Sequence, residues 1–118
     1  FIVGEHKWKL LLYPKGSASG KGKSLSLYLE LADRENVNLT LPCERKLYAK
    51  YKLRVRDQVN GINHEHEAKR WFCSSITAWG HSDFLSLSDL NDTSKGFIVN
   101  DTLIVEVQFM VMSVFKDI

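Results

Sequence analysis

Residues Ser24–Leu31, SLSLYLEL, place leucine at every second position. Side chains two residues apart in an extended chain lie on the same face. The four leucines therefore share one face, and Ser24, Ser26, Tyr28 and Glu30 share the other. A helix, with about 3.6 residues per turn, would scatter the leucines around its circumference. The segment thus predicts a strand with an apolar face in the core and a polar face in water.

The rest of the chain predicts further strands that cover the leucine face. Two polar connections, 14–23 and 33–42, lie on either side of the central segment, and Asn60-Gly61 predicts a hairpin turn. No segment shows sustained helical periodicity, so the fold expected is all-β, an antiparallel β-sandwich. The other predicted strands are His6–Tyr13, Lys46–Gln58, Glu67–Ser75, Trp79–Leu87 and Thr102–Phe115.

Length and composition indicate one folded domain, residues 1–118. The formal net charge is only +2 and the basic residues are spread along the chain, which argues against nucleic acid as a partner. The most apolar segment, Phe109–Met112, is far shorter than the ~20 residues that span a bilayer, so no membrane role is expected. Because the chain begins with Phe1, we interpret it as part of a longer protein, located inside the cell, in the cytoplasm or nucleus.

The chain has two cysteines, Cys43 and Cys73, without a surrounding disulfide framework. Free buried thiols are the common interpretation of such a pair, although a secreted domain could join them. Three Asn-x-Thr triplets, at Asn38, Asn91 and Asn100, favour secretion, but triplets of this kind match easily by chance.

Two motifs resemble chemical sites without completing them. Gly16–Ser24 ends in Gly-Lys-Ser, as a phosphate-binding loop does, but it leads into a predicted strand instead of a helix. His64, Glu65 and His66 could join Cys73 around a metal, yet a second pair of ligands is missing, and we interpret them as solvated loop residues. No nucleophile motif is present. The sequence therefore predicts no enzyme activity, metal or cofactor.

Three aromatic residues differ in their expected surroundings. Tyr51 lies on the apolar face of its predicted strand, and Trp79 stands at a strand start, where tryptophan is more often core than ligand site. Tyr28 shares its face with serine and glutamate, which is typical of an exposed or groove-lining aromatic.

The order of several short motifs resembles the MATH domain, the meprin and TRAF homology fold, over essentially the whole chain. Each motif is weak alone, and the similarity depends on their order. The wording Tyr-Pro-Lys-Gly and Val-Asn-Asp-Thr is similar to plant members attached to ubiquitin-specific proteases, BTB adaptors or coiled-coil proteins. The motifs are Phe1–Gly4 followed by Trp8, Leu12–Gly16, Leu25–Leu29, Trp79-Gly80 with Phe84-Leu85, and Gly96–Leu103.

This resemblance implies a TRAF-like sandwich that binds short extended peptide segments of protein clients in a shallow groove. The matching groove positions are Tyr28, Tyr51, Trp79 and Gly80. BTB-linked members have Lys-Asp before the tryptophan and an aromatic after the glycine. Here Thr77, Ala78 and His81 stand in those places, so we expect a different peptide preference and include Thr77 and His81 in the site.

The family's first strand, which pairs with the last, has no counterpart in this chain. We therefore expect Thr102–Phe115 to present an open edge that promotes self-association. The function predicted is an interaction module that recruits clients to ubiquitin-related machinery. Two alternatives stay open: a secreted adhesion sandwich with Cys43 bonded to Cys73, and a structural domain that positions a neighbouring catalytic domain.

Overall fold

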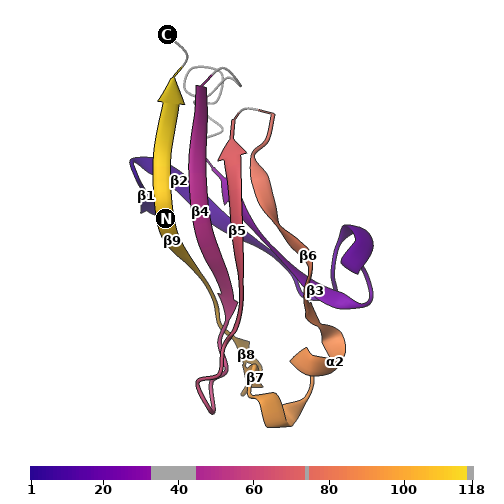
Figure 1. Cartoon of the computed structure of the whole chain (residues 1–118). Helices are drawn as coiled ribbons and strands as arrows, with labels where there is room; N and C mark the ends of the chain where they lie inside the picture. Colours follow the sequence, from indigo (N-terminus) through magenta and orange to yellow (C-terminus); the bar gives the residue numbers. More distant parts are fainter. Residues whose placement is uncertain (33–44, 74, 117–118) are drawn as a thin grey trace.

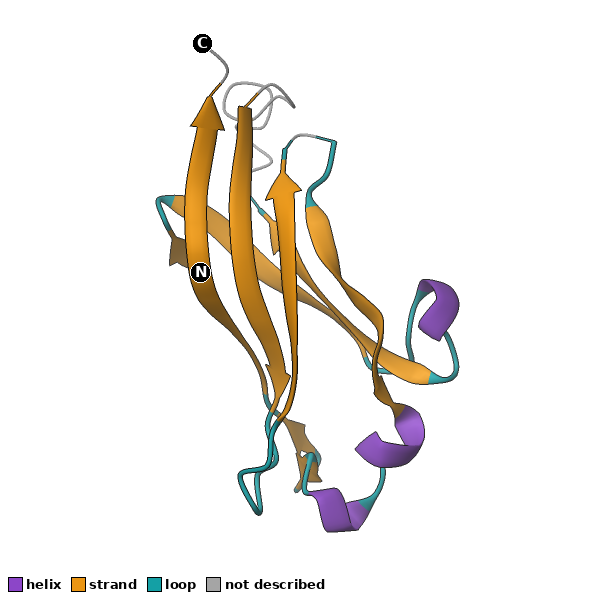
Figure 2. Ribbon diagram, viewed as in Figure 1, coloured by secondary structure: helices purple, strands orange, loops and turns teal. Residues whose placement is uncertain are grey.

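The computed structural model describes residues 1–32, 45–73 and 75–116, and it is built mainly from strands (Figures 1 and 2). The predicted loop at 33–42 lies outside these residues. The strands are β1 (Ile2–Val3), β2 (His6–Tyr13), β3 (Ser24–Leu31), β4 (Arg45–Val55), β5 (His64–Phe72), β6 (Ala78–Ser86), β7 (Ile98–Val99), β8 (Thr102–Leu103) and β9 (Val105–Lys116). The described residues also form three short helical turns: η1 (Ala18–Gly20), α2 (Leu87–Leu90) and η3 (Thr93–Lys95).

The strands form two antiparallel layers, in the orders β1-β2-β3-β6 and β5-β4-β9, with β7 and β8 as a small separate pair (Figure 1). This confirms the predicted all-β sandwich. The bounds of β2 and β3 agree with the predicted ones, whereas the last predicted strand is divided into β8 and β9. The short helix α2 follows β6 directly. Ser86, the last residue of β6, caps this helix by accepting a hydrogen bond from the Asp89 amide.

The core lies between the two layers and contains the leucine face of β3. Leu25, Leu27 and Leu29 have no exposed surface. The other layer contributes aromatic rings, and Phe72 lies edge-on to Trp8 at a centroid separation of 5.2 Å. Burial of these large apolar side chains is the main source of stability for a domain of this size.

The polar face of β3 is also buried, which corrects the prediction that it faces water. Ser26 is fully buried and Glu30 is 4% exposed. The connection 14–23 folds over this face: the Ser17 amide donates to the Ser26 hydroxyl, which donates to the Ser82 carbonyl. Lys9 pairs with Glu30 at 3.3 Å. Alternation therefore identified a strand correctly, but it could not show that a loop covers the second face.

The turn between β4 and β5 is a longer loop than the predicted two-residue hairpin at Asn60-Gly61. Gly61 has a φ of +73°, whereas Asn60 is not in the left-handed region. The buried carboxylate of Asp57 organises the loop by accepting hydrogen bonds from the backbone amides of Val59, Asn60 and Ile62. These bonds hold the pKa of Asp57 below its usual value.

Cys73 takes part in a disulfide bond, which corrects the interpretation of a free thiol. Its predicted partner, Cys43, lies outside the described residues. A single disulfide requires only that two cysteines approach within about 4.4–6.8 Å between Cα atoms, and sequence spacing does not reveal that distance. Within the described segments, no helix is long and apolar enough to cross a membrane.

Candidate functional site

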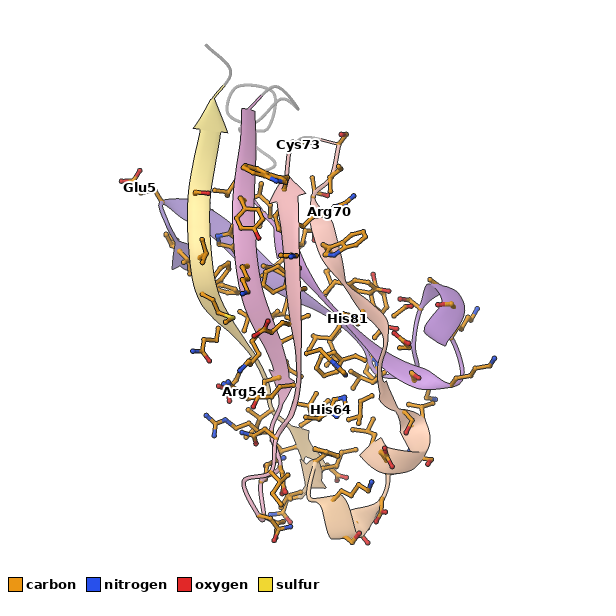
Figure 3. All side chains as sticks on the ribbon, viewed as in Figure 1. Glu5, Arg54, His64, Arg70, Cys73 and His81 are labelled. Carbon is orange, nitrogen blue, oxygen red and sulfur yellow. The ribbon has the colours of Figure 1, made fainter. Side chains whose placement is uncertain are left out.

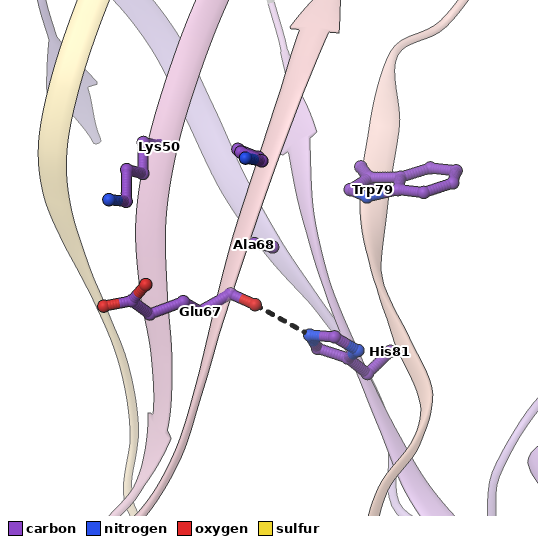
Figure 4. A pocket seen from close by; sticks show the side chains of 6 residues that line it. Lys50, Glu67, Ala68, Trp79 and His81 are labelled. Carbon is purple, nitrogen blue, oxygen red and sulfur yellow. Dashed lines mark hydrogen bonds between the residues drawn. The ribbon is translucent and has the colours of Figure 1, made fainter.

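A pocket of about 380 Å³ lies between β5 and β6, the outer strands of the two layers (Figure 4). Among the described strands, β5 pairs only with β4 and β6 only with β3, so two sheet edges meet at this place. We call the line between them the seam. The pocket is lined by Lys50, Glu67, Ala68, Lys69, Trp79 and His81.

Trp79 is 41% exposed and forms one wall of the pocket. Arg70 of β5 crosses the seam, and its guanidinium carbon lies 4.0 Å from the centroid of the tryptophan ring (Figure 3). A cation over an indole face is an attractive arrangement. The Nε atom of Arg70 is buried and has no hydrogen-bond partner among the described residues. This pair is therefore held together, yet it leaves one donor of the guanidinium unsatisfied.

Tyr51, a predicted peptide contact, is fully buried beneath the seam. Its hydroxyl donates a 2.6 Å hydrogen bond to the backbone carbonyl of Trp79. Burial raises the pKa of Tyr51 above its ordinary value, although the nearby Arg70 opposes that shift. The hydroxyl therefore stays protonated and remains a donor. The Tyr51 ring thus has no exposed surface with which to contact a peptide, and its hydroxyl is bonded to the backbone of Trp79.

Gly80 pairs directly with Tyr28 across β3 and β6. A Cβ atom at Gly80 would lie 2.3 Å from the Leu27 carbonyl oxygen and 2.7 Å from the Tyr28 Cα, so this position has no room for a side chain. Tyr28 alternates with the buried leucines, which places its ring on the face of the sheet opposite to that of Trp79. There the Tyr28 hydroxyl lies 2.9 Å from the Ser17 hydroxyl. The two predicted aromatics are thus adjacent in register, but their side chains do not share one groove.

His81 closes the lower part of the pocket, where its Nε2 atom lies 3.3 Å from the Glu67 carbonyl oxygen (Figure 4). The centroid of the His66 ring lies 5.3 Å from the ring centroid of His81 and 4.8 Å from that of His64. His64 is anchored by a 2.6 Å contact between its Nε2 atom and the Phe84 carbonyl oxygen. His64 and His66 therefore belong to β5 and pack along the seam, which corrects their interpretation as loop residues. Across the described residues, no group of three or more candidate ligands is placed to hold a metal.

Thr77 is half-buried and lies just before β6, outside the residues that line the pocket. Its carbonyl accepts a 2.7 Å hydrogen bond from the Leu31 amide, so its backbone extends the pairing of β3 and β6. Of the predicted site residues, Trp79 and His81 line the pocket and Gly80 joins them. Tyr51 supports them from below, Thr77 precedes them, and Tyr28 lies on the other face.

Sequence reasoning missed the basic side chains around the pocket, Lys50, Lys69 and Arg70. A signal for Arg70 was present, because it lies two residues from the buried Ala68 and two from the buried Phe72 in β5 and so shares their face. That spacing directs Arg70 towards the inner side of the strand. Which residue it meets there depends on how the two layers are placed, and no local pattern contains that information.

Comparison with known proteins gives a family match over most of the chain. A model described as "MATH domain" matches residues 1–109. Ubiquitin C-terminal hydrolase 13 of Arabidopsis thaliana is 35% identical over 97% of this chain, which covers 10% of that protein. Two Arabidopsis thaliana proteins named "MATH domain and coiled-coil domain-containing" are 37% and 36% identical over 97% of this chain, which covers 40% and 33% of their lengths. The chain thus spans a tenth to two fifths of these relatives.

Proposed function

This chain belongs to the MATH domain family, and we propose that it binds short extended peptide segments of client proteins in the pocket between β5 and β6. MATH domains are in general non-catalytic modules of protein interaction. In this proposal the side chain of Trp79 contacts an apolar peptide side chain. Gly80 lets β6 pack closely on β3, and His81 forms the lower boundary of the pocket.

The single observation that carries the proposal is the 41% exposed Trp79 beside two sheet edges that no other described strand pairs with. A large aromatic ring offers contact area at low entropic cost, and an unpaired edge offers backbone donors and acceptors to an extended chain. A segment of five or six residues buries little surface, so we expect dissociation constants of about micromolar order. Several copies of the domain in one assembly would strengthen capture by multivalency.

Peptide display on this domain, with Trp79→Ala and Tyr28→Ala compared side by side, tests the proposal. Both rings belong to the predicted groove, but they lie on opposite faces of the β3–β6 pair, so each variant serves as the control of the other. We expect the Trp79→Ala variant to lose about tenfold or more in affinity for selected peptides, and the Tyr28→Ala variant to retain it. If calorimetry gives the reverse ranking, the peptide binds on the Tyr28 face instead. If the double variant binds as well as the unmodified domain, neither face is the binding site.

Recruitment to ubiquitin-related machinery is the finer part of the proposal. Its support is that relatives 35% identical to this chain are named ubiquitin C-terminal hydrolases. The expectation is that clients captured through the pocket change in ubiquitination when Trp79 is replaced by alanine in the full-length protein. Ubiquitination that is unchanged while capture is lost would separate client binding from that pathway.

We also propose self-association through β9. Among the described strands, β9 pairs only with β4, so its other edge carries unpaired backbone groups, and Met110 and Val111 are 43% and 48% exposed. Long apolar edges of this kind pair readily with another chain. Light scattering at micromolar concentration should give a mass above that of a monomer, and Val111→Lys should restore the monomer. A monomer in the unmodified domain would contradict this proposal.

A further inference from the structure

The outer face of the β5–β4–β9 layer carries two kinds of charge arrangement. Towards one end, cations are matched by acids: Arg54 binds Glu65 at 2.9 Å, Lys52 lies 3.6 Å from Glu65, and Arg56 binds Glu106. Towards the pocket the matching stops. There Lys50 and Lys69 stand directly opposite each other in the register of β4 and β5. Among the described residues, neither lysine has an acidic partner.

Like charges at directly opposed positions destabilise a sheet, so their presence needs a reason. On its other side, in β9, Lys50 faces the apolar Val111. The next pair along the two strands, Tyr48 and Trp71, is aromatic, with ring centroids 5.0 Å apart. The lysine pair is therefore flanked by an aromatic pair on one side and by Lys52 opposite Glu67 on the other. Among the described residues, neither lysine forms an ion pair with Glu67.

Arg70 adds a third cation nearby, on the inner face of β5 at the seam. It follows Lys69 in β5 and reaches across the seam to Trp79, and its buried Nε atom has no hydrogen-bond acceptor among the described residues. A buried donor without an acceptor is costly, and such groups are often completed by a ligand. Glu67 is the only acid among the residues that line the pocket. Two lysines and one carboxylate thus line the pocket, and the Arg70 guanidinium lies beside them against the Trp79 ring.

We infer that the peptide bound in this pocket carries acidic side chains, whose carboxylates are held by Lys50, Lys69 and Arg70 while Trp79 contacts an adjacent apolar residue. This inference rests on the proposed function and names the chemical class of its ligand. Arginine and lysine form charge-assisted hydrogen bonds with carboxylates, and the planar guanidinium can bind two oxygens at once. An acidic residue would supply both the missing counter-charge and the missing acceptor.

The test uses two pools of fluorescent octapeptides with identical randomised flanking positions and with either Glu or Gln at the two central positions. These residues have nearly the same shape, so the comparison isolates the charge. We expect the Glu pool to bind about tenfold more tightly at low salt, with the difference decreasing as salt is added. Lys69→Gln should reduce this preference about threefold, because it removes one of the cations that hold the carboxylates. Folding should not suffer, because the substitution removes a like-charge contact.

Lys52→Gln is the matched control, since Lys52 lies on the same face of β4 and already faces Glu65. It removes the same charge and should leave the preference intact. Equal binding of the two pools, with Trp79→Ala still weakening both, would overturn this inference and leave the proposed function standing. An equal loss in the Lys52 and Lys69 variants would overturn it as well, because the effect would then be one of overall charge. Absence of binding by both pools would overturn the proposed function together with the inference.

Discussion

The hydroxyl of Tyr51 donates a 2.6 Å hydrogen bond to the backbone carbonyl of Trp79 and so joins the buried face of one sheet to the outer strand of the other. Within the described residues, this bond and the Arg70–Trp79 stacking cross the seam beside the pocket. The position of the exposed indole therefore depends on a residue that is itself hidden from any ligand.

Tyr51→Phe tests this dependence. The ring stays in the core, and only the hydrogen bond is lost, so we expect the free energy of unfolding to fall by about 0.5–1.5 kcal/mol. Peptide affinity should fall a few-fold, because Trp79 loses its anchor. Urea denaturation and calorimetry measure the two effects. A variant with unchanged affinity would show that Tyr51 serves the core alone.

Gly80→Ala should destabilise the domain. Its Cβ would overlap the Leu27 carbonyl oxygen and the Tyr28 Cα, both backbone atoms that cannot rotate away. Overpacking of this kind typically costs about 1–3 kcal/mol, and it would push β6 away from β3. Thermal unfolding measures the loss. A melting temperature equal to that of the unmodified domain would contradict the close approach of these strands.

Mild acid should weaken the fold through His66. Burial lowers the pKa of His66 below the ordinary value of 6.5, and the neighbouring His64 and His81 lower it further, while Asp83 acts in the opposite direction. The unfolded chain therefore binds the proton more readily than the folded one. The contribution of His66 to the free energy of unfolding should be fully present above pH 6.5. It should be lost as the pH falls from there through the lowered pKa of the folded state.

Chemical denaturation at a series of pH values measures this slope, and His66→Gln should flatten it. A slope that persists in the His66 variant would assign the acid sensitivity to other groups.

The disulfide at Cys73 predicts that stability responds to reductant. Thiol titration of the unfolded, unreduced domain should detect no free cysteine, and added reductant should lower the melting temperature. Cys73→Ser should lower it to the same extent without reductant. The expected intracellular location would instead favour free thiols, because the cytosol keeps cysteines reduced. Titration of protein isolated from its native cells therefore reports on the compartment.

The fold was predictable because its strands carry their own periodicity. The leucines of β3 fixed both its bounds and its inward face. The burial of Ser26 and Glu30 was not predictable, since it depends on a polar connection that folds back over them.

The site was predictable only in part, for a related reason. Trp79 and His81 were expected and do line the pocket. Alternation separated Tyr28 from the buried leucines. The pairing of Tyr28 with Gly80 sets where its ring lies relative to Trp79, and the register between distant strands is absent from local patterns. The contact of Arg70 with Trp79 depends in the same way on the packing of two separate sheets.

Because Lys50 and Lys69 stand opposite each other in β4 and β5, binding of an acidic peptide should be coupled to the stability of the fold. Repulsion between the two ammonium groups opposes the pairing of β4 and β5. A peptide carboxylate bound between them would attract both and so favour that pairing. A ligand present at a hundred times its dissociation constant adds about 2.7 kcal/mol to the free energy of unfolding. Peptides that bind tightly should therefore raise the melting temperature of the domain. Heat resistance thus becomes a label-free readout of which peptides the domain prefers.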